Sequence, residues 1–386
     1  MVLTKEILKP YLDIRVYKEA KTLANNGFEV IVLCRVYSRS DLPQKEIYEN
    51  FTIIRHKCSL SKNRYKFRFE QLIQNFKNVL SMSKKIIQLN PSIIHAHDLN
   101  ALFESVLAKR KLDVPLIYDS HEDFPRWERA KGSNIAYFGA LIYEKILLTN
   151  VDNIITVNET IAKKFKTNKP VTIIHNFPSY KDYVKNQKLI AEIKYKYNLQ
   201  NKIVNEYHGV ISYNRGFELI LQVLEELSKV YDNVRLLLIG PFPEKLKKIT
   251  KSKNLDEYLI FTGPIDYKEI ASYISVSNIS YAVIKPIEQY LISTPTKMFE
   301  SMLMEKPVLA NSEFPEVVKI MNTIESKKPG ELVKYDKNAI ISILKKLIDD
   351  EVLRKRYGKN ARQLVIAKYT WNTQEKKLLD LYREIF

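Results

Sequence analysis

The chain has 386 residues, 45% of them hydrophobic, and a net charge of +18. Because this length exceeds the ~100–200 residues of a typical domain, we expect two domains with real cores. The two cysteines, Cys34 and Cys58, exclude a disulfide framework and a cysteine-rich metal site. No apolar run reaches the ~20 residues that span a bilayer, and residues 1–15 are unlike a signal peptide. These features favour a cytoplasmic protein.

The excess of positive charge indicates an anionic partner. Three kinds of partner fit: nucleic acid, an anionic membrane face and a phosphorylated substrate. A general drift of composition toward lysine would explain the charge equally well.

Short β-branched apolar runs alternate with amphipathic segments through the first half of the chain. Strands are expected at residues 28–33, 92–95, 116–118 and 153–157. Helical periodicity predicts helices at residues 15–25 and 99–111. This alternation is typical of a parallel sheet with helices on both faces.

Residues 61–85 form a basic amphipathic segment within this half. Their many lysines and arginines are opposed by one acid, Glu70, and aromatic and aliphatic side chains lie between them. Such a segment can lie on an anionic membrane or contact nucleic acid. The alternative, which we favour for the apolar face, is a helix docked on the sheet with its lysines in solvent.

Two loops in the first half concentrate titratable side chains. They are residues 95–99 and 118–125, and each follows the end of an expected strand. Their ionisable residues are His95, His97, Asp98, Asp119, His121, Glu122 and Asp123. A metal site would need mixed ligands from both loops. We therefore favour contacts with substrate hydroxyl groups and expect no metal.

The alternation pauses at residues 176–202, where we expect a linker and a helix, and then restarts. The strands expected in this half are residues 203–207, 234–239, 259–262, 279–283 and 307–310. Residues 217–230 carry the apolar face of an amphipathic helix. Residues 353–386 are expected to form helices with a break near residues 369–371. The chain thus predicts a second α/β unit of similar size.

The loop at residues 208–217 (HGVISYNRGF) follows a strand and precedes a helix. Gly209 permits a tight turn close to a ligand. Arg215 lies where the helix begins, at the edge of the sheet where ligands bind in open α/β folds. Arginine pairs well with phosphate oxygens. The alternative is an ordinary solvent-exposed arginine.

The segment at residues 286–310 indicates a second anion-binding element. Ser293 or Thr294 can cap a helix whose first residue is Pro295. Lys297 and Glu300 then share one face of its first turns. A helix N-terminus beside a fixed cation suits a phosphate group, and a carboxylate one turn later suits ribose hydroxyls. The alternative is a capped helix with a surface Lys–Glu pair.

Taken in order, these segments resemble the GT-B fold glycosyltransferases, most of all the retaining enzymes of glycosyltransferase family 4. The resembling segments are residues 13–20, 27–33, 95–99, 118–123, 175–176, 208–216, 238–241, 261–264, 295–307 and 369–371. The resemblance implies an α/β fold of two Rossmann-like domains whose parallel sheets face a central cleft. Residues 1–178 would be the acceptor-binding domain and residues 179–365 the nucleotide-sugar-binding domain. Residues 366–386 would form a helix packed back on the first domain.

The resemblance also implies roles for individual residues. Arg215 and Lys297 would hold the donor diphosphate and act in catalysis, and Glu300 would bind the nucleotide ribose. His121 would act beside the donor sugar. The further donor-binding residues would be Gly209, Ser293 and Thr296, and the acceptor-binding residues would be His97, Asp98 and Glu122.

The sequence departs from the family pattern at three places. Val210 stands where an arginine often follows the glycine, and Ile292 stands where a second glutamate is expected upstream of Glu300. Ser293, or Glu288 from a shifted loop, would then contact the sugar. Residues 9–12 replace a glycine-rich loop.

From the resemblance we expect transfer of a sugar from a nucleotide-sugar donor to a hydroxyl acceptor, with retention and without a metal or other cofactor. The acceptor would be lipid-linked or a glycan, in polysaccharide, glycolipid or glycoprotein glycan assembly. An anionic membrane surface is a further expected partner and nucleic acid is not. Alternatives are a non-catalytic or degraded sugar-nucleotide-binding protein and a sugar-nucleotide epimerase. With 9 glycines and no G-x-G-x-x-G run, a nicotinamide dehydrogenase is disfavoured.

Overall fold

The computed structural model describes residues 1–3, 13–37, 42–60, 68–243, 246, 250, 255–324 and 326–385. Residues 9–12 and the start of the basic segment, residues 61–67, lie outside this description. The chain forms two compact units. The first unit is Met1–Asn176 with Gln374–Phe386, and the second unit is Phe177–Thr373. The boundary expected from the sequence was residues 178/179, and the final helical segment was expected from residue 366.

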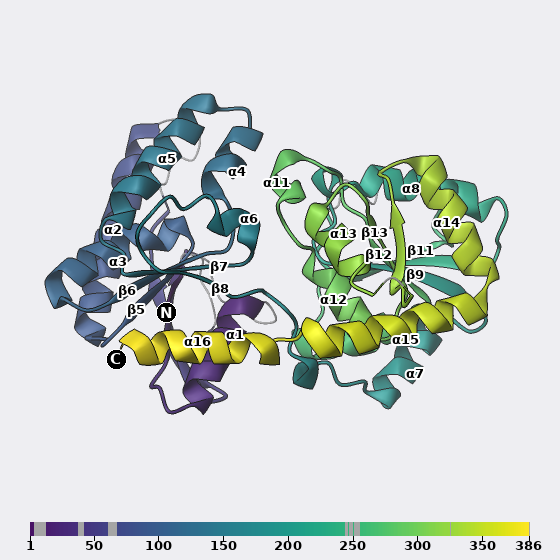
Figure 1. Cartoon of the computed structure of the whole chain (residues 1–386), viewed down its shortest axis with the longest axis horizontal. Helices are drawn as coiled ribbons and strands as arrows, with labels where there is room; N and C mark the ends of the chain where they lie inside the picture. Colours follow the sequence, from purple (N-terminus) through teal and green to yellow (C-terminus); the bar gives the residue numbers. More distant parts are fainter. Residues whose placement is uncertain are drawn as a thin grey trace. The chain divides into compact units, whose positions relative to one another are not determined.

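The first unit is built on a mainly parallel sheet (Figure 1). Its strands are β1 (Val2–Leu3), β2 (Ile31–Val36), β3 (Lys45–Tyr48), β4 (Phe51–Lys57), β5 (Ile94–His97), β6 (Leu116–Ser120), β7 (Asn153–Thr156) and β8 (Val171–Ile173). Among the described residues the strand order is β3-β4-β2-β1-β5-β6-β7-β8. Strand β3 pairs antiparallel with β4, whereas β1, β2 and β5 pair parallel with their neighbours. The strand order therefore reverses beside β1.

Helices cover this sheet. They are α1 (Ile14–Asn25), α2 (Arg68–Leu89), α3 (Leu99–Leu112), α4 (Phe124–Ala130), α5 (Asn134–Leu148), α6 (Glu159–Ala162) and α16 (Asn372–Ile385). Asp13 caps α1 by accepting the backbone N–H of Val16 at 3.4 Å. The buried face of α1 includes Arg15, Lys18 and Glu19. Charged side chains are seldom buried unless they are paired, so this face marks α1 as more than a packing element.

The second unit has a fully parallel sheet. Its strands are β9 (Ile203–His208), β10 (Val234–Ile239), β11 (Leu259–Gly263), β12 (Ile279–Ala282), β13 (Val308–Asn311) and β14 (Gly330–Val333). Their order in the described chain is β11-β10-β9-β12-β13-β14, so the direction of winding reverses between β9 and β12. The helical elements are η1 (Tyr180–Asp182), α7 (Gln187–Lys196), η2 (Tyr213–Arg215), α8 (Phe217–Ser228), η3 (Tyr267–Glu269), α10 (Ile270–Ser275), α11 (Glu288–Leu291), α12 (Thr296–Leu303), α13 (Pro315–Met321), α14 (Lys337–Asp349) and α15 (Glu351–Lys368).

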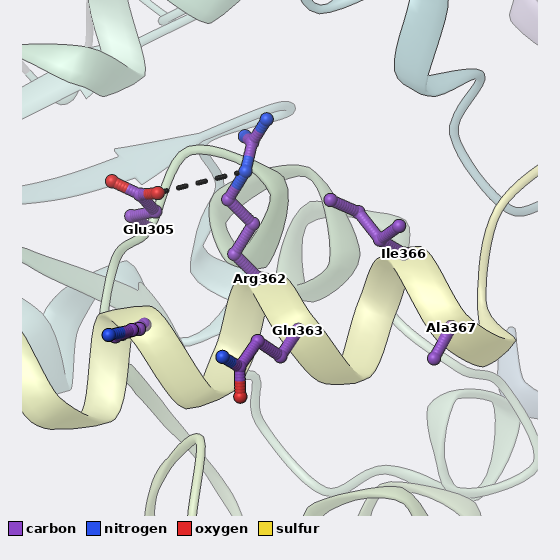
Figure 2. A pocket seen from close by; sticks show the side chains of 6 residues that line it. Glu305, Arg362, Gln363, Ile366 and Ala367 are labelled. Atoms are coloured by element: carbon purple, nitrogen blue, oxygen red, sulfur yellow. Dashed lines mark ion pairs between the residues drawn. The ribbon is translucent and has the colours of Figure 1, made fainter.

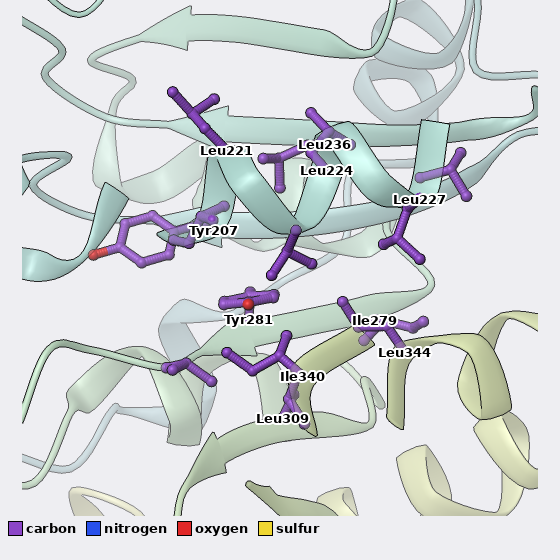
Figure 3. Close-up of a cluster of buried hydrophobic side chains, with 14 of the residues drawn as sticks. Tyr207, Leu221, Leu224, Leu227, Leu236, Ile279, Tyr281, Leu309, Ile340 and Leu344 are labelled. Carbon is purple, nitrogen blue, oxygen red and sulfur yellow. The ribbon is translucent and has the colours of Figure 1, made fainter. Parts of the chain in front are cut away.

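A core of aliphatic side chains holds α8 and α14 on this sheet (Figure 3). Strand β10 is almost continuously apolar because helices cover both faces of the sheet. Leu224 of α8 is 3% exposed and packs in this core, as does Leu344 of α14. Replacing such a leucine with alanine typically costs about 2–5 kcal/mol. The core therefore fixes the loop that joins β9 to α8.

The expected elements agree with the structure best where the pattern is strongest. The strand expected at residues 234–239 is found with those bounds, and the helix break near residues 369–371 is confirmed between α15 and α16. The strand placed at residues 28–33 was wrong by three residues, because it begins at Ile31. Strands β3, β4, β8 and β14 were not anticipated. None of the described helices is long and apolar enough to cross a bilayer.

Candidate functional site

The turn after β9 lies at the point where the strand order of the second sheet reverses, which is where open α/β sheets bind ligands. Gly209 occupies this turn with φ +104°. Residues other than glycine rarely adopt that backbone conformation. A Cβ at this position would lie 3.8 Å from Nζ of Lys297. The glycine therefore provides the turn and keeps the space beside that ammonium group clear.

Lys297 is the second residue of α12, and its side chain is buried. Its Nζ lies 3.3 Å from the centroid of the Tyr207 ring. It has no hydrogen-bond partner among the described residues. Burial lowers the pKa of Lys297 well below its ordinary value, and the charge of Arg215 lowers it further. The alternative of a surface pair between Lys297 and Glu300 is therefore wrong, because Lys297 is buried.

Arg215 ends η2, just before Gly216 at φ +91°. Its guanidinium carbon lies 5.4 Å from the centroid of the Tyr290 ring. Burial raises the pKa of Tyr207 to about 12, and the charge of Arg215 acts against that rise. Both cations thus act on Tyr207 and on each other, so the two loops converge. An anion between them would relieve their repulsion.

Glu300 lies one turn after Lys297 and takes part in a buried chain of polar groups. Its Oε2 lies 2.6 Å from Nε2 of His208, whose Nδ1 lies 2.9 Å from Oε2 of Glu206. The Ser301 hydroxyl donates to Oε1 of Glu206 at 2.8 Å. Burial lowers the pKa of His208, but the two carboxylates outweigh it and raise the pKa to about 9. The imidazolium therefore fixes the orientation of the Glu300 carboxylate.

The cap expected for α12 was wrong. Pro295 occupies the cap position, and α12 begins at Thr296. The Ser293 hydroxyl instead donates to the carbonyl oxygen of Tyr290 at 2.8 Å, so it holds the preceding turn. Ile292 is the C-cap residue directly after α11, which ends at Leu291. Thr296, the first residue of this helix, directly precedes Lys297, and Ser293 lies four residues before Lys297.

A second polar cluster lies in the first unit, at the ends of β5 and β6. Arg15 donates from Nε and Nη2 to the two oxygens of Asp119 at 2.7 and 2.9 Å. Its Nη1 donates to the carbonyl oxygen of Ile174 at 2.8 Å. Burial raises the pKa of Asp119, but the Arg15 charge and His121 outweigh it, so the pKa lies well below its usual range. This ion pair anchors α1 to β6.

The expected acceptor-side residues partly gather around that ion pair. Nε2 of His121 lies 3.1 Å from Oδ2 of Asp119 and 3.1 Å from Nδ1 of His97. The Asp98 carboxylate accepts the backbone N–H of His121 at 3.3 Å. Burial lowers the pKa of His121, but Asp98 and Asp119 raise it to about 9. The Glu122 side chain is exposed, and its carbonyl oxygen accepts from Ser120.

A pocket of about 420 Å³ lies elsewhere in the second unit (Figure 2). Glu305 and residues of α15 line it, and Glu305 pairs with Arg362 at 3.7 Å. None of the residues expected to bind donor lines it. This pocket is therefore separate from the cation pair.

Comparison with known families agrees with this arrangement. A family model described as Glycosyltransferase Family 4 matches residues 13–177, and one described as Glycosyl transferases group 1 matches residues 190–364. The chain belongs to the GT-B glycosyltransferases of the group 1/family 4 type. The expected α/β fold with two Rossmann-like domains is confirmed.

Curated relatives of this glycosyltransferase differ in how much of the chain they match. Alpha-D-kanosaminyltransferase of Streptomyces kanamyceticus is 25% identical over 198 residues, which are 50% of this chain and 49% of that protein. The chain thus matches about half the length of that relative. The capsular polysaccharide biosynthesis glycosyltransferase CapM of Staphylococcus aureus is 27% identical over 67% of this chain and 67% of its own.

Solved structures share the fold over most of the chain. Sucrose-phosphate synthase of Thermosynechococcus elongatus has a TM-score of 0.76 at 20% identity, covering 97% of this chain and 93% of its own. Anabaena HepE in complex with UDP-glucose has a TM-score of 0.70 at 13% identity, covering 99% and 98%. At these identities the likeness concerns the fold.

Sequence reasoning missed the residues that support the expected ones. Tyr207 and Glu206 were assigned only to a strand, and Arg15 and Glu19 only to a resembling segment. The available signal was the presence of ionisable residues on buried elements: an acid in the apolar strand at residues 203–207, and charges on the apolar face of the helix at residues 15–25. Such residues are expensive to bury unless they are paired.

Proposed function

We propose that this glycosyltransferase moves a sugar from a nucleotide-sugar donor to a hydroxyl acceptor with retention of anomeric configuration. The observation that carries the proposal is the buried Nζ of Lys297, which lacks a hydrogen-bond partner in the described chain and lies beside Arg215. Keeping Lys297 charged in a buried site that is also subject to the charge of Arg215 costs free energy, which lowers its pKa. A diphosphate between Lys297 and Arg215 would remove that cost and restore the charge of Lys297.

The same arrangement suits the bond that must break. As the bond between the anomeric carbon and the diphosphate lengthens, negative charge grows on the leaving oxygen. Fixed cations that meet this charge lower the barrier. Arg215 and Lys297 supply that charge without a metal, aided by the N–H groups at the start of α12 near Thr296. Glu300, held by His208 at 2.6 Å, would bind ribose hydroxyls.

Gly209 and Ser293 complete the proposed donor site, one as the open turn beside Lys297 and the other toward the sugar. Anabaena HepE, which shares the fold, was solved with UDP-glucose, and this supports a nucleotide-sugar donor. On the acceptor side we assign His121 to the reacting hydroxyl. Its neighbour Asp98 and the exposed Glu122 would bind the acceptor, and the buried His97 would support His121 from behind.

The decisive variant is Lys297→Met, which removes the charge but keeps an unbranched side chain over Tyr207. We expect kcat/KM to fall about 10²–10³-fold, as when a charge-stabilising donor is lost. Lys359→Met is the matched control, because Lys359 is an exposed lysine of the same unit at the separate pocket. Turnover is measured by release of nucleoside diphosphate, after a thermal-shift screen has selected the donor.

Wild-type turnover in Lys297→Met would remove the diphosphate assignment. A second candidate follows from Val210, which is 49% exposed where an arginine was expected, and from Ile292 in place of a glutamate. A chain that binds a sugar nucleotide but forms no product with any hydroxyl acceptor would be a sugar-nucleotide-binding protein. Conversion of the donor alone would indicate an epimerase.

We assign the acceptor to lipid-linked or glycan substrates of polysaccharide, glycolipid or glycoprotein glycan assembly. The S. aureus relative acts in capsular polysaccharide biosynthesis, which supports this class. The protein would then work in the cytoplasm at the inner membrane face.

Helix α5 supports that location. Ile135, Phe138, Ile142 and Ile146 are 60–89% exposed at helical spacing, and α2 adds Leu72 and Phe76. Together with the net charge of +18, such a face suits an anionic bilayer. Wild type should sediment with anionic vesicles at low salt, and Ile142→Glu should sediment less. Equal sedimentation of the two proteins would contradict a role of the α5 face in membrane binding.

A further inference from the structure

Four buried side chains of the first unit bring their donor atoms to one point. They are Glu19 of α1, His95 and His97 of β5, and Asp119 of β6, and one donor atom from each lies within 4.8 Å of the others. Oε2 of Glu19 lies 3.8 Å from Nε2 of His95 and 3.9 Å from Nε2 of His97. Nε2 of His95 lies 3.7 Å from Oδ2 of Asp119. We refer to these four residues as the Glu19 cluster.

Three inward-facing atoms of the Glu19 cluster have no partner. Oε1 of Glu19 forms an ion pair with Nε of Arg15 at 3.1 Å. Oε2 of Glu19 and Nε2 of both histidines have no hydrogen-bond partner among the described residues. Glu19 is 0% exposed and His95 is 1% exposed, so bulk water does not satisfy them. A buried polar atom without a partner typically costs about 1–3 kcal/mol. Three such atoms, Oε2 of Glu19 and Nε2 of both histidines, lie close together and indicate that something binds there.

The outward-facing nitrogens of the two histidines are already engaged. Nδ1 of His95 lies 2.9 Å from the hydroxyl of Tyr382 on α16. Nδ1 of His97 lies 3.1 Å from Nε2 of His121. The two imidazole rings stack with centroids 4.3 Å apart, and both Nε2 atoms approach Oε2 of Glu19. A metal-binding histidine has this arrangement, with one nitrogen on the ion and the other fixed by a neighbour.

We propose that the Glu19 cluster binds one divalent first-row transition-metal ion, and that Zn²⁺ is the best match. Two imidazole nitrogens and two carboxylates form a four-coordinate set typical of zinc. Zinc bonds of about 2.0–2.2 Å to such ligands place neighbouring donors about 3.3–3.6 Å apart. Three of the separations are 3.7–3.9 Å and need to close by a few tenths of an ångström. The others are within 4.8 Å and need to close by at most about 1.5 Å.

The ion has a structural role in this site. All four ligands are buried, so no substrate reaches a metal bound there, whereas a catalytic zinc keeps an open position. The ion joins α1 to β5 and β6 and so supports His121, which contacts both His97 and Asp119. It takes no part in the transfer step at Lys297. A metal here departs from the sequence-based expectation that the chain binds none.

The test uses the full chain, purified through a tag that contains no histidine. The chain is stripped with a chelator, incubated with ZnCl₂, desalted and analysed for metal content. We expect one Zn²⁺ per wild-type chain and a higher melting temperature with zinc than without it. Glu19→Gln and His97→Gln should each lose zinc affinity by at least about tenfold. His56→Gln, which replaces a half-buried histidine bonded to Ser81 in the same unit, should bind zinc as wild type does.

Circular dichroism establishes that each variant is folded, and Glu19→Gln is the variant that changes least in shape. Wild type could instead bind one equivalent of another first-row divalent ion that Glu19→Gln and His97→Gln do not bind. That result would support the site and correct the identity of the ion. Substoichiometric uptake by stripped wild type overturns the proposal. So does an equal zinc content in wild type, Glu19→Gln and His97→Gln, because the zinc would then be bound elsewhere.

Discussion

Both units bury charged side chains beside the carboxyl ends of parallel strands, but they leave opposite charges without partners. In the first unit the cation is fully engaged, since Arg15 binds both oxygens of Asp119 and pairs with Oε1 of Glu19, while Oε2 of Glu19 has no hydrogen-bond partner in the described chain. In the second unit the anions are engaged, since His208 bridges Glu206 and Glu300, while Lys297 has no partner there.

The difference indicates what each unit is built to receive. Unpaired carboxylate and imidazole atoms favour a cation, and an unpaired ammonium group beside an arginine favours an anion. It also predicts that removing a buried positive charge has opposite effects on stability in the two units. Arg15 compensates buried charge, whereas Lys297 adds an uncompensated one.

The largest expected effect follows from Arg15→Met. Without the guanidinium, Asp119 keeps its charge in a site with 0% exposure, and the free energy of unfolding should fall by about 3–5 kcal/mol. Urea denaturation of metal-free protein measures it. Arg126→Met is the control, because Arg126 pairs with Asp123 at 3.3 Å while 40% exposed, and such pairs contribute about 0–1 kcal/mol. Equal losses of unfolding free energy in Arg15→Met and Arg126→Met would mean that the buried pair contributes no more to stability than the exposed one.

The next effect concerns the pH dependence of the second unit. The pKa of His208 rises from 6.5 to about 9 because Glu206 on β9 and Glu300 on α12 outweigh burial. The native state therefore binds more protons than the unfolded state between these values, so stability is complete below pH 6.5 and declines as pH rises through 9. The total loss should be about 3 kcal/mol.

His208→Gln should remove the share of this decline that belongs to His208, because glutamine does not titrate. The share of His121, whose pKa is also raised to about 9, should remain. Denaturation of the metal-free protein across that pH range gives the measurement. The nearby charge of Lys297 also acts on Glu206 and Glu300, so Lys297→Met is measured in parallel. His56→Gln should keep the decline seen in wild type. If His208→Gln declines as steeply as wild type, the bridge between the two carboxylates does not control the pH dependence.

The two regions also differ in how far the sequence predicts them. Gly209, Arg215 and Lys297 could be found because a turn glycine, an arginine at a helix start and a lysine after proline are local patterns. Their convergence on Tyr207 depends on how α12 packs beside β9 in the folded chain, and local sequence patterns do not contain that information. The role of His208 was likewise out of reach, since its two carboxylate partners come from different elements.

In the first unit the sequence identified the two loops but not their arrangement. His95 and His97 are two residues apart on one strand, so their spacing places both on the same face of the sheet. It does not reveal which side chains meet them there. Glu19 lies far away in the chain, on a helix whose apolar pattern predicts packing. Tyr382 approaches His95 from α16. Only the folded chain brings these four residues together.

The smallest effect is a gain in stability. Lys297→Met removes a buried ammonium group without a partner, so the ligand-free protein should become more stable by about 1–2 kcal/mol. Because the pKa of Lys297 is lowered from 10.5, the unfolded state binds more protons than the native state. The contribution of Lys297 to wild-type stability therefore rises with pH, and the advantage of the variant should shrink toward pH 10.5. Lys359→Met, at an exposed position, should change stability by less than about 0.5 kcal/mol.

Nucleoside diphosphate should reverse the order of stability of wild type and Lys297→Met, so that wild type becomes the more stable protein. Bound between Arg215 and Lys297, it raises the stability of wild type by mass action, whereas Lys297→Met loses one of the two contacts. The measurement is the melting temperature of each protein with and without the ligand. An equal ligand-induced shift in wild type and Lys297→Met would mean that the ammonium group does not contact the diphosphate. A variant less stable than wild type without ligand would mean that Lys297 has a partner in the folded state.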